Sequence, residues 1–153
     1  MDASKEEFRQ AVEPQFLSQA FTSGIKLRIG QMNKTEHEGI IRDIGRYEIN
    51  LDVNGSLITL LKQEISYLTS PHSLIVPPPS QRDEEANAPA GRPNIQQEFL
   101  DKAIKDNQFL TLYLINGQRI KAYLEAYDSF TLLLKEGDRQ HLYYKHSITT
   151  INR

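Results

Sequence analysis

The sequence predicts a mainly β fold with short α-helices, arranged as two related units joined by a linker. Short apolar runs alternate with polar residues and end at turn signals, a pattern typical of short strands. The pattern also repeats, because residues of the first half match residues 83 positions later without a gap. Phe16 and Leu27, for example, correspond to Phe99 and Leu110. We therefore interpret the two halves as products of an internal duplication.

A proline-rich segment separates the two halves. Residues 77–93 have almost no apolar side chains to bury, and their prolines favour extended, solvated backbone. We predict domains at 1–76 and 94–153, with 77–93 as a flexible linker. Such a linker spans at most about 55 Å, at roughly 3.3 Å per residue.

Each half is expected to begin with a helix. In the second half, Asn94 is a good N-cap and Gln97 follows at the spacing of a capping box. Ile95, Phe99 and Ala103 then fall on one helical face. In the first half, Pro14 suits a first helical turn. The apolar residues of that first helix are Phe16, Leu17, Ala20 and Phe21.

Five short strands are expected after the second helix. Alternating apolar residues indicate strands from Leu110 and from Ile120, joined by the tight-turn dipeptide Asn116-Gly117. Three further runs cover Phe130 to Leu134, His141 to Lys145, and Ser147 to Ile151. A helix and five strands in about 60 residues predict a small, strongly bent sheet or barrel. Because so small a unit buries little surface and has open edge strands, we expect it to assemble.

Composition excludes several classes of protein. Charged residues make up 25% of the 153 and hydrophobic residues 39%, and no apolar run approaches the ~20 residues that span a bilayer. The absence of cysteine excludes disulfides and thiolate metal sites, and the four histidines lack zinc-ligand spacing. We therefore expect neither a metal nor a cofactor. An acidic, polar N-terminus argues against a signal peptide, which fits a cytoplasmic protein.

Charge is distributed unevenly along the chain. The whole chain has a net charge of −2, whereas residues 94–153 alone carry a net charge of +1. A polyanion would therefore bind more readily to the second half than to the first. Candidate acid–base pairs such as Asp128 with Glu125 have no nucleophile, metal set or phosphate-binding loop beside them, so an enzyme is not expected.

The second half resembles a known family in several motifs. They are Gln96, Phe99-Leu100, residues 113–117, residues 125–130, and Tyr144-Lys145-His146 with residues 147–150. In these motifs the chain resembles the bacterial Hfq RNA chaperones of the Sm/LSm family, with the first half as a diverged Sm-like unit. The resemblance implies two tandem Sm-like units, each an N-terminal helix on a five-stranded, strongly bent antiparallel sheet. It also implies a six-unit ring joined through edge strands.

The resemblance further implies an RNA site on the helix-bearing face. Members of this family hold U-rich RNA there, at positions matched by Gln96, Phe130, Tyr144, Lys145 and His146. The chemistry suits that role, because an aromatic ring stacks on a base, an ammonium meets a phosphate, and an imidazole reaches a 2′-hydroxyl. Weaker equivalents in the first half are Tyr47, Lys62 and Gln63.

The opposite face of the family holds A-rich RNA. The matching positions here are Tyr113, Gly117, Arg119 and Ile120. In the first half this face is expected to be lost, because Gly30 replaces the tyrosine and the carboxylates of Glu36 and Glu38 would repel phosphate.

We predict an RNA-binding protein that holds uridine-rich, and also adenine-rich, single strands such as small regulatory RNA and mRNA. The alternative is a structural Sm-like scaffold with weak RNA affinity, favoured by the acidic first half. Two assemblies remain open. Three two-unit chains could close a six-unit ring, or six chains could place their second units in one ring with the first units outside it.

Overall fold

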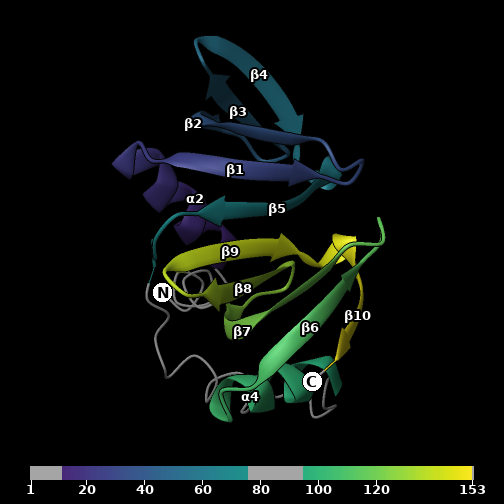
Figure 1. Ribbon diagram of the computed structural model, residues 1–153. Helices are drawn as coiled ribbons and strands as arrows, with labels where there is room; N and C mark the ends of the chain where they lie inside the picture. Colours follow the sequence, from purple (N-terminus) through teal and green to yellow (C-terminus); the bar gives the residue numbers. More distant parts are fainter. Residues whose placement is uncertain (1–11, 76–94, 153) are drawn as a thin grey trace.

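A computed structural model describes residues 12–75 and 95–152, with the side chains of residues 95–97 left aside. Ten strands form one sheet in the order β10-β6-β7-β8-β9-β5-β1-β2-β3-β4. In Figure 1 the strands of the first half lie above those of the second, and the sheet continues between them. The predicted fold class is confirmed, whereas the predicted linker lies outside the described residues. Neither described helix combines the length and apolar character needed to cross a membrane.

The two halves have the same elements in the same order. The first unit consists of α2 (Val12–Ser23), β1 (Lys26–Gln31), β2 (Glu36–Ile44), β3 (Glu48–Val53), β4 (Ser56–Leu61), the 3₁₀ turn η1 (Lys62–Glu64) and β5 (Ile65–Ser70). The second unit consists of α4 (Ile95–Lys105), β6 (Phe109–Leu114), β7 (Arg119–Tyr127), β8 (Thr131–Glu136), β9 (Arg139–Tyr144), η2 (Lys145–Ser147) and β10 (Ile148–Asn152). Each strand and each 3₁₀ turn begins 83 residues after its counterpart, as the sequence repeat predicted.

Local irregularities repeat as well. The β2–β3 ladder shifts register between Ile41 and Asp43, and the β7–β8 ladder shifts between Leu124 and Ala126, which are the corresponding residues. An extra residue in one strand bends it and increases its twist, so the strands of both units bend at the same place. Sequence patterns had located these strands only to within about two residues.

The largest correction concerns the tripeptide Tyr144-Lys145-His146. The sequence predicted a strand over residues 141–145, but β9 ends at Tyr144, and the two residues after it begin the turn η2. In a strand, consecutive side chains point to opposite faces of the sheet. In a turn, they are not restricted to those two faces. Lys145 and His146 therefore contact different surroundings.

The two units are joined by strand pairing within the chain. Strand β5 runs antiparallel to β9, with Tyr67 opposite Tyr143 and Leu68 opposite Leu142. We call this contact the internal seam. Leu142 and Tyr144 of the second unit belong to the hydrophobic core of the first. The two units therefore bury apolar surface against each other. Such burial stabilises a contact by about 25 cal/mol per Å² of apolar area removed from water.

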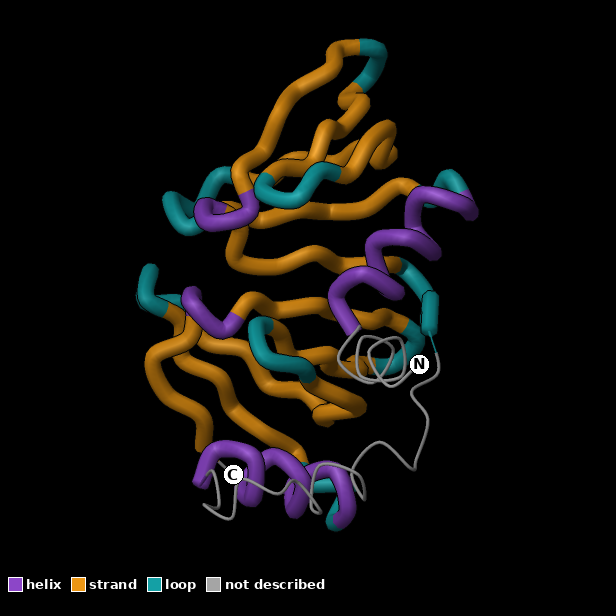
Figure 2. Tube along the Cα trace, turned by 180° about the vertical axis from the view of Figure 1, so that it is seen from behind, coloured by secondary structure: helices purple, strands orange, loops and turns teal. Residues whose placement is uncertain are grey.

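Helix α2 also bridges the internal seam. It packs on β2 of its own unit and reaches β8 of the second unit, as Figure 2 shows from behind. Its face toward the sheet carries Phe16, Leu17 and Ala20, all almost completely buried. At the two ends of the sheet, β4 and β10 each pair on one side only. These outer strands are open edges of the described structure.

Candidate nucleic-acid interface

Two exposed aromatic rings occupy equivalent turns in the two units. Phe130 lies between β7 and β8 and is 72% exposed, and Tyr47 lies between β2 and β3 and is 69% exposed. In each unit the residue that follows the fourth strand bonds to this turn. The amide of Lys145 donates to the carbonyl of Phe130 at 2.8 Å, and that of Lys62 donates to Tyr47 at 2.9 Å. Each unit thus brings an exposed ring and a lysine together.

Asp128 builds the turn that presents Phe130. Its Oδ1 accepts from the amides of Phe130 at 2.9 Å and Thr131 at 2.7 Å, and from the Thr131 hydroxyl at 2.7 Å. Its Oδ2 accepts from the amide of Glu13 at 3.0 Å. One buried carboxylate therefore fixes both the aromatic turn and the start of α2 from the other unit. A carboxylate near a helix N-terminus also meets a favourable helix dipole.

Tyr144 and His146 face the internal seam. Their rings stack with centroids 5.2 Å apart and planes inclined by 5°. His146 Nε2 lies 2.8 Å from the Ile65 carbonyl, which can only accept, so Nε2 carries the proton. The His146 ring is exposed, whereas Tyr144 is buried and its hydroxyl donates to Glu13 at 2.5 Å. Burial, followed by the charge of Glu13, raises the pKa of Tyr144, so this hydroxyl keeps its proton.

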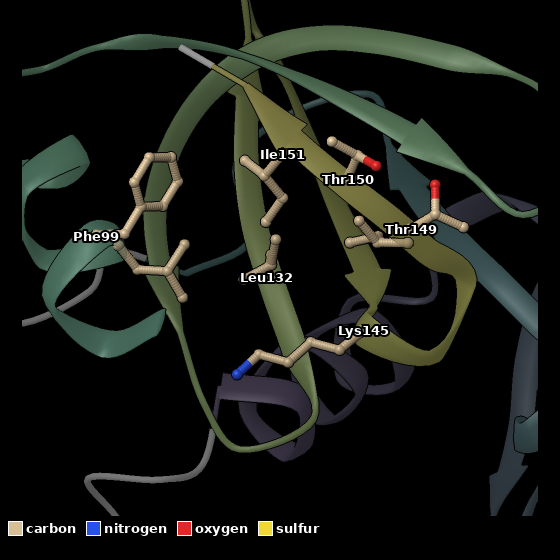
Figure 3. A pocket seen from close by; sticks show the side chains of 8 residues that line it. Phe99, Leu132, Lys145, Thr149, Thr150 and Ile151 are labelled. Carbon is tan, nitrogen blue, oxygen red and sulfur yellow. The ribbon is translucent and has the colours of Figure 1, made fainter. Parts of the chain in front are cut away.

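Lys145 turns toward its own unit. Its ammonium lies 5.6 Å from the centroid of the Tyr127 ring, within the range of a cation–π contact. Figure 3 shows the Lys145 side chain along the mouth of a pocket of about 400 Å³. The pocket lies between α4 and β10 and is lined by Phe99, Leu100, Leu132, Lys145, Ile148, Thr149, Thr150 and Ile151. We call it the edge pocket.

The predicted helix-face residues therefore divide into two groups. Phe130 and Lys145 share the second unit, whereas Tyr144 and His146 lie at the internal seam beside Glu13 and Lys62. The side chain of Gln96 lies outside the described residues. Of the first-unit equivalents, Tyr47 and Gln63 are exposed and Lys62 is half-buried.

The second predicted site lies on the β6–β7 hairpin. Tyr113 is half-buried and pairs with the exposed Arg119, while Ile120 pairs with Leu112. Gly117 turns the chain at a φ of +92°, which side chains rarely adopt, and no neighbour would obstruct a Cβ there. The hairpin turn lies at the end of β6 farther from α4 (Figure 1). All four predicted residues are thus gathered on one hairpin.

The first unit fills the corresponding position itself. A Cβ on Gly30 would lie 2.2 Å from the Tyr67 ring, so Tyr67 occupies the space that a larger residue at position 30 would need. The Tyr67 ring packs 5.2 Å from Tyr143, and its hydroxyl donates to Glu36. Burial raises the pKa of Tyr67, with a further contribution from Glu36. These contacts close this face of the first unit.

Comparison with known proteins assigns the second unit to a family. The Hfq protein family matches residues 95–153. The RNA-binding protein Hfq of Bacillus thuringiensis (strain Al Hakam) is 46% identical over 57 residues, which are 37% of this chain and 77% of that protein. The chain belongs to the Hfq family.

The chain is similar to further Hfq proteins. The RNA-binding protein Hfq of Bacillus cereus (strain B4264) has the same identity and coverage. A 1.55 Å crystal structure of the pleiotropic translational regulator Hfq covers 39% of this chain and 100% of its own, at 33% identity and a TM-score of 0.38. Membership of the Hfq family agrees with the expectation that the chain is not an enzyme.

Some residues of this interface were not expected from Hfq-like motifs. Asp128 was named within the Hfq-like motif 125–130 and weighed as a catalytic carboxylate, but it was given no structural role, although its spacing to Thr131 is that of a side-chain-capped turn. Glu13 aligns with Gln96 at the offset of 83 residues. Its contact with Tyr144 depends on how the two units dock, which neither half encodes alone.

Proposed function

We propose that this chain binds single-stranded, uridine-rich RNA on its helix-bearing face and acts as an Hfq-like chaperone in post-transcriptional regulation. One observation carries the proposal. Phe130 is 72% exposed, and its turn is bonded directly to the backbone of Lys145. The exposed ring offers a stacking surface to a base, and the lysine whose backbone is bonded to its turn offers a cation to a phosphate. RNA binding by the curated Hfq relatives supports this assignment.

Each residue of the helix-bearing face has a distinct role in this proposal. Phe130 stacks on a base, which contributes about 1–3 kcal/mol. Lys145 neutralises phosphate, and Gln96 reads a base edge. His146 presents its second ring nitrogen to a 2′-hydroxyl, because Nε2 already donates to Ile65. Buried Tyr144 supports the imidazole from behind.

The opposite face is proposed to bind adenine-rich RNA through the second unit alone. Tyr113 stacks on a base, Arg119 meets phosphate, and Gly117 and Ile120 allow close approach of the strand. The first unit does not contribute, because Tyr67 fills its pocket and Glu36 and Glu38 repel phosphate. Small regulatory RNA and mRNA are the expected partners.

We also propose that three chains close a ring of six units. The open strands β4 and β10 are the counterparts of β9 and β5, which already pair inside the chain. Repeating that register between chains would place Thr150 opposite Leu60 and Ile151 opposite Thr59. The alternative with only second units in one ring is disfavoured, because β5 of the same chain already covers the β9 edge.

The edge pocket supports the same assembly. Its residues Phe99 and Ile151 are half-buried, whereas their counterparts Phe16 and Leu68 are completely buried in the first unit. The second unit covers that position in the first, with Leu142 and Tyr144 joining its core. The first unit of the next chain would cover the edge pocket in the same way. Residues 1–76 and 94–153 then act as successive ring domains connected by 77–93.

A structural scaffold with weak RNA affinity is the competing function. It is favoured by the first unit, where carboxylates replace the cations of the opposite face. Phosphate binding distinguishes the two functions, because each phosphate contact makes affinity fall with rising salt.

The test is a titration of the full chain with short oligo-uridine and oligo-adenine at several salt concentrations. We expect oligo-uridine binding to weaken steeply with salt, and Lys145→Ala or Phe130→Ala to weaken it at least tenfold. Lys135→Ala is the control, since Lys135 is an exposed lysine on β8 away from the site. Oligonucleotide binding that changes neither with salt nor with these substitutions would favour the scaffold. The absence of binding would favour it as well.

A further inference from the structure

We call Glu13, Tyr47 and Lys62 the first-unit pocket, and these residues differ from their second-unit counterparts by one charge. The lysine and the exposed ring are present in both units, as Lys62 with Tyr47 and as Lys145 with Phe130. At the helix position that accompanies them, the second unit has the neutral Gln96, whereas the first unit has a carboxylate. An amide leaves the charge of a neighbouring ammonium intact, but a carboxylate can cancel it.

Glu13 directly engages the lysine of its own unit. Its Oε2 lies 3.3 Å from the ammonium of Lys62, and the two side chains are only 16% and 18% exposed. The Tyr144 hydroxyl donates to the same oxygen at 2.5 Å. An ion pair so shielded from water is screened much less by salt than a pair on the open surface.

The carboxylate is held in place by both units. The amide of Glu13 donates to Asp128 at 3.0 Å, which fixes the first turn of α2 over the internal seam. Buried Tyr144 approaches from β9 of the second unit. A phosphate arriving at Lys62 would therefore meet a cation already neutralised by a fixed anion, and it would have to break that pair.

We propose that Glu13 closes the first-unit pocket to RNA, so that only the second unit of each chain binds uridine-rich strands on this face. This inference rests on the proposed function and deepens it. In a ring of three chains, open and closed pockets would alternate, giving three binding pockets among six units. Glu13 is thus a residue that sets the number of RNA contacts.

The experiment measures hexauridine affinity and its salt dependence for the full chain and four variants. We expect Lys145→Ala to weaken binding at least tenfold and Lys62→Ala to change it less than twofold. Glu13→Gln should strengthen binding severalfold and steepen the salt dependence, by about 0.7 in log–log slope for each new phosphate contact. The double variant Glu13→Gln/Lys62→Ala should lose that gain, because the gain depends on the released lysine.

Two controls separate this effect from damage to the structure. Glu13→Gln keeps an oxygen that accepts from Tyr144, and the molecular mass and melting temperature of each variant should match those of the wild type. Equal loss of affinity in Lys62→Ala and Lys145→Ala, or no gain in Glu13→Gln, would overturn the closed pocket while leaving RNA binding intact. Failure of the wild type and every variant to bind hexauridine would instead contradict the proposed function, and this inference with it.

Discussion

At the scale of single residues, Asp128 connects the aromatic turn to the neighbouring unit. It is 5% exposed, and its two oxygens accept four hydrogen bonds, from Glu13, Phe130 and Thr131. Bonds to a charged group contribute about 1.5–3 kcal/mol each, and donors left unpaired on burial add a penalty. The equivalent turn of the first unit has no such carboxylate, since the residue that corresponds to Asp128 is Gly45.

We predict that Asp128→Ala lowers the free energy of unfolding by about 3 kcal/mol, since it leaves buried amides without an acceptor. Urea unfolding of the full chain measures this loss. Asp128→Asn keeps one oxygen acceptor and should lose less. Asp138→Ala, in an exposed turn, is the matched control and should leave stability unchanged. Equal stability of the Asp128→Ala and Asp138→Ala variants would contradict the role of Asp128.

Sequence reasoning named candidate site residues, whose part in RNA binding stays a prediction, but it did not describe their surroundings. The exposed Phe130 and the turn residues Lys145 and His146 were all identified from motifs and the Hfq resemblance. The directions of the Lys145 and His146 side chains were not predicted. They depend on a 3₁₀ turn of three residues, which is too short to be recognised from the sequence. Burial of Tyr144 follows from docking between units, which is a long-range contact.

At the scale of secondary-structure elements, the β5–β9 pair carries the buried histidine His141. His141 Nε2 donates to Glu136 at 2.9 Å, and the Thr69 hydroxyl lies 2.8 Å from Nδ1. Burial lowers the pKa of His141 below its ordinary value, and this effect exceeds the opposing influence of Glu136. Because the unfolded chain then binds a proton more readily, the contribution of His141 to stability is complete above about pH 6.5 and declines below it.

We therefore expect the free energy of unfolding to fall between pH 7 and pH 5 more steeply in the wild type than in His141→Gln. Urea unfolding at a series of pH values measures the slope. His72→Gln is the control, because His72 is exposed and its hydrogen bonds to Ser70 use only its backbone. Parallel slopes for the wild type and His141→Gln would show that His141 does not titrate with unfolding.

The order of the helices and strands was predictable because the same sequence pattern occurs in both halves of the chain. Where one half gave weak alternation, the other half supplied the register, and the structure keeps the offset of 83 residues in every strand. Side-chain contacts between neighbouring strands were harder to predict. Gly30 in place of Tyr113 looked like a loss, yet Tyr67 stands where the second unit has Thr150, so the ring has moved to the neighbouring strand.

At the scale of the whole molecule, the contact inside the chain and the proposed contact between chains differ in chemistry. Leu142, Tyr144 and His141 of the internal seam correspond to Thr59, Leu61 and Ile58 on β4. The hydrogen bonds from Tyr144 to Glu13 and between His141 and Thr69 therefore have no counterpart between chains. We expect dilution to separate chains before it separates the two units of one chain.

Leu61→Asp tests the contact between chains. Leu61 is 49% exposed in the single chain, and the proposed ring would bury it against the next chain, where a carboxylate would be costly. We predict that this variant converts a trimer into a monomer of unchanged melting temperature, as measured by light scattering and circular dichroism. Lys34→Asp, in a turn away from β4, should stay trimeric. A monomeric wild type at micromolar concentration would contradict the ring.

The sequence could not decide which unit pairs with which. Edge strands and a small core predicted association, but a linker of seventeen residues reaches a neighbour in the same chain or in another. The choice rests on details such as Gln140, which binds the backbone of Leu74 and Ile75 just beyond β5. These details are visible only once both units are docked.

Pairing β5 with β9 inside one chain gives the sheet a direction. One end is always the first unit and the other always the second, so three copies close a ring only by joining head to tail, through a heterologous contact. In a ring of identical single units, a substitution appears at every interface and must be compatible with all of them. Here one half can lose a group as long as its permanent neighbour compensates, which leaves the two halves free to specialise.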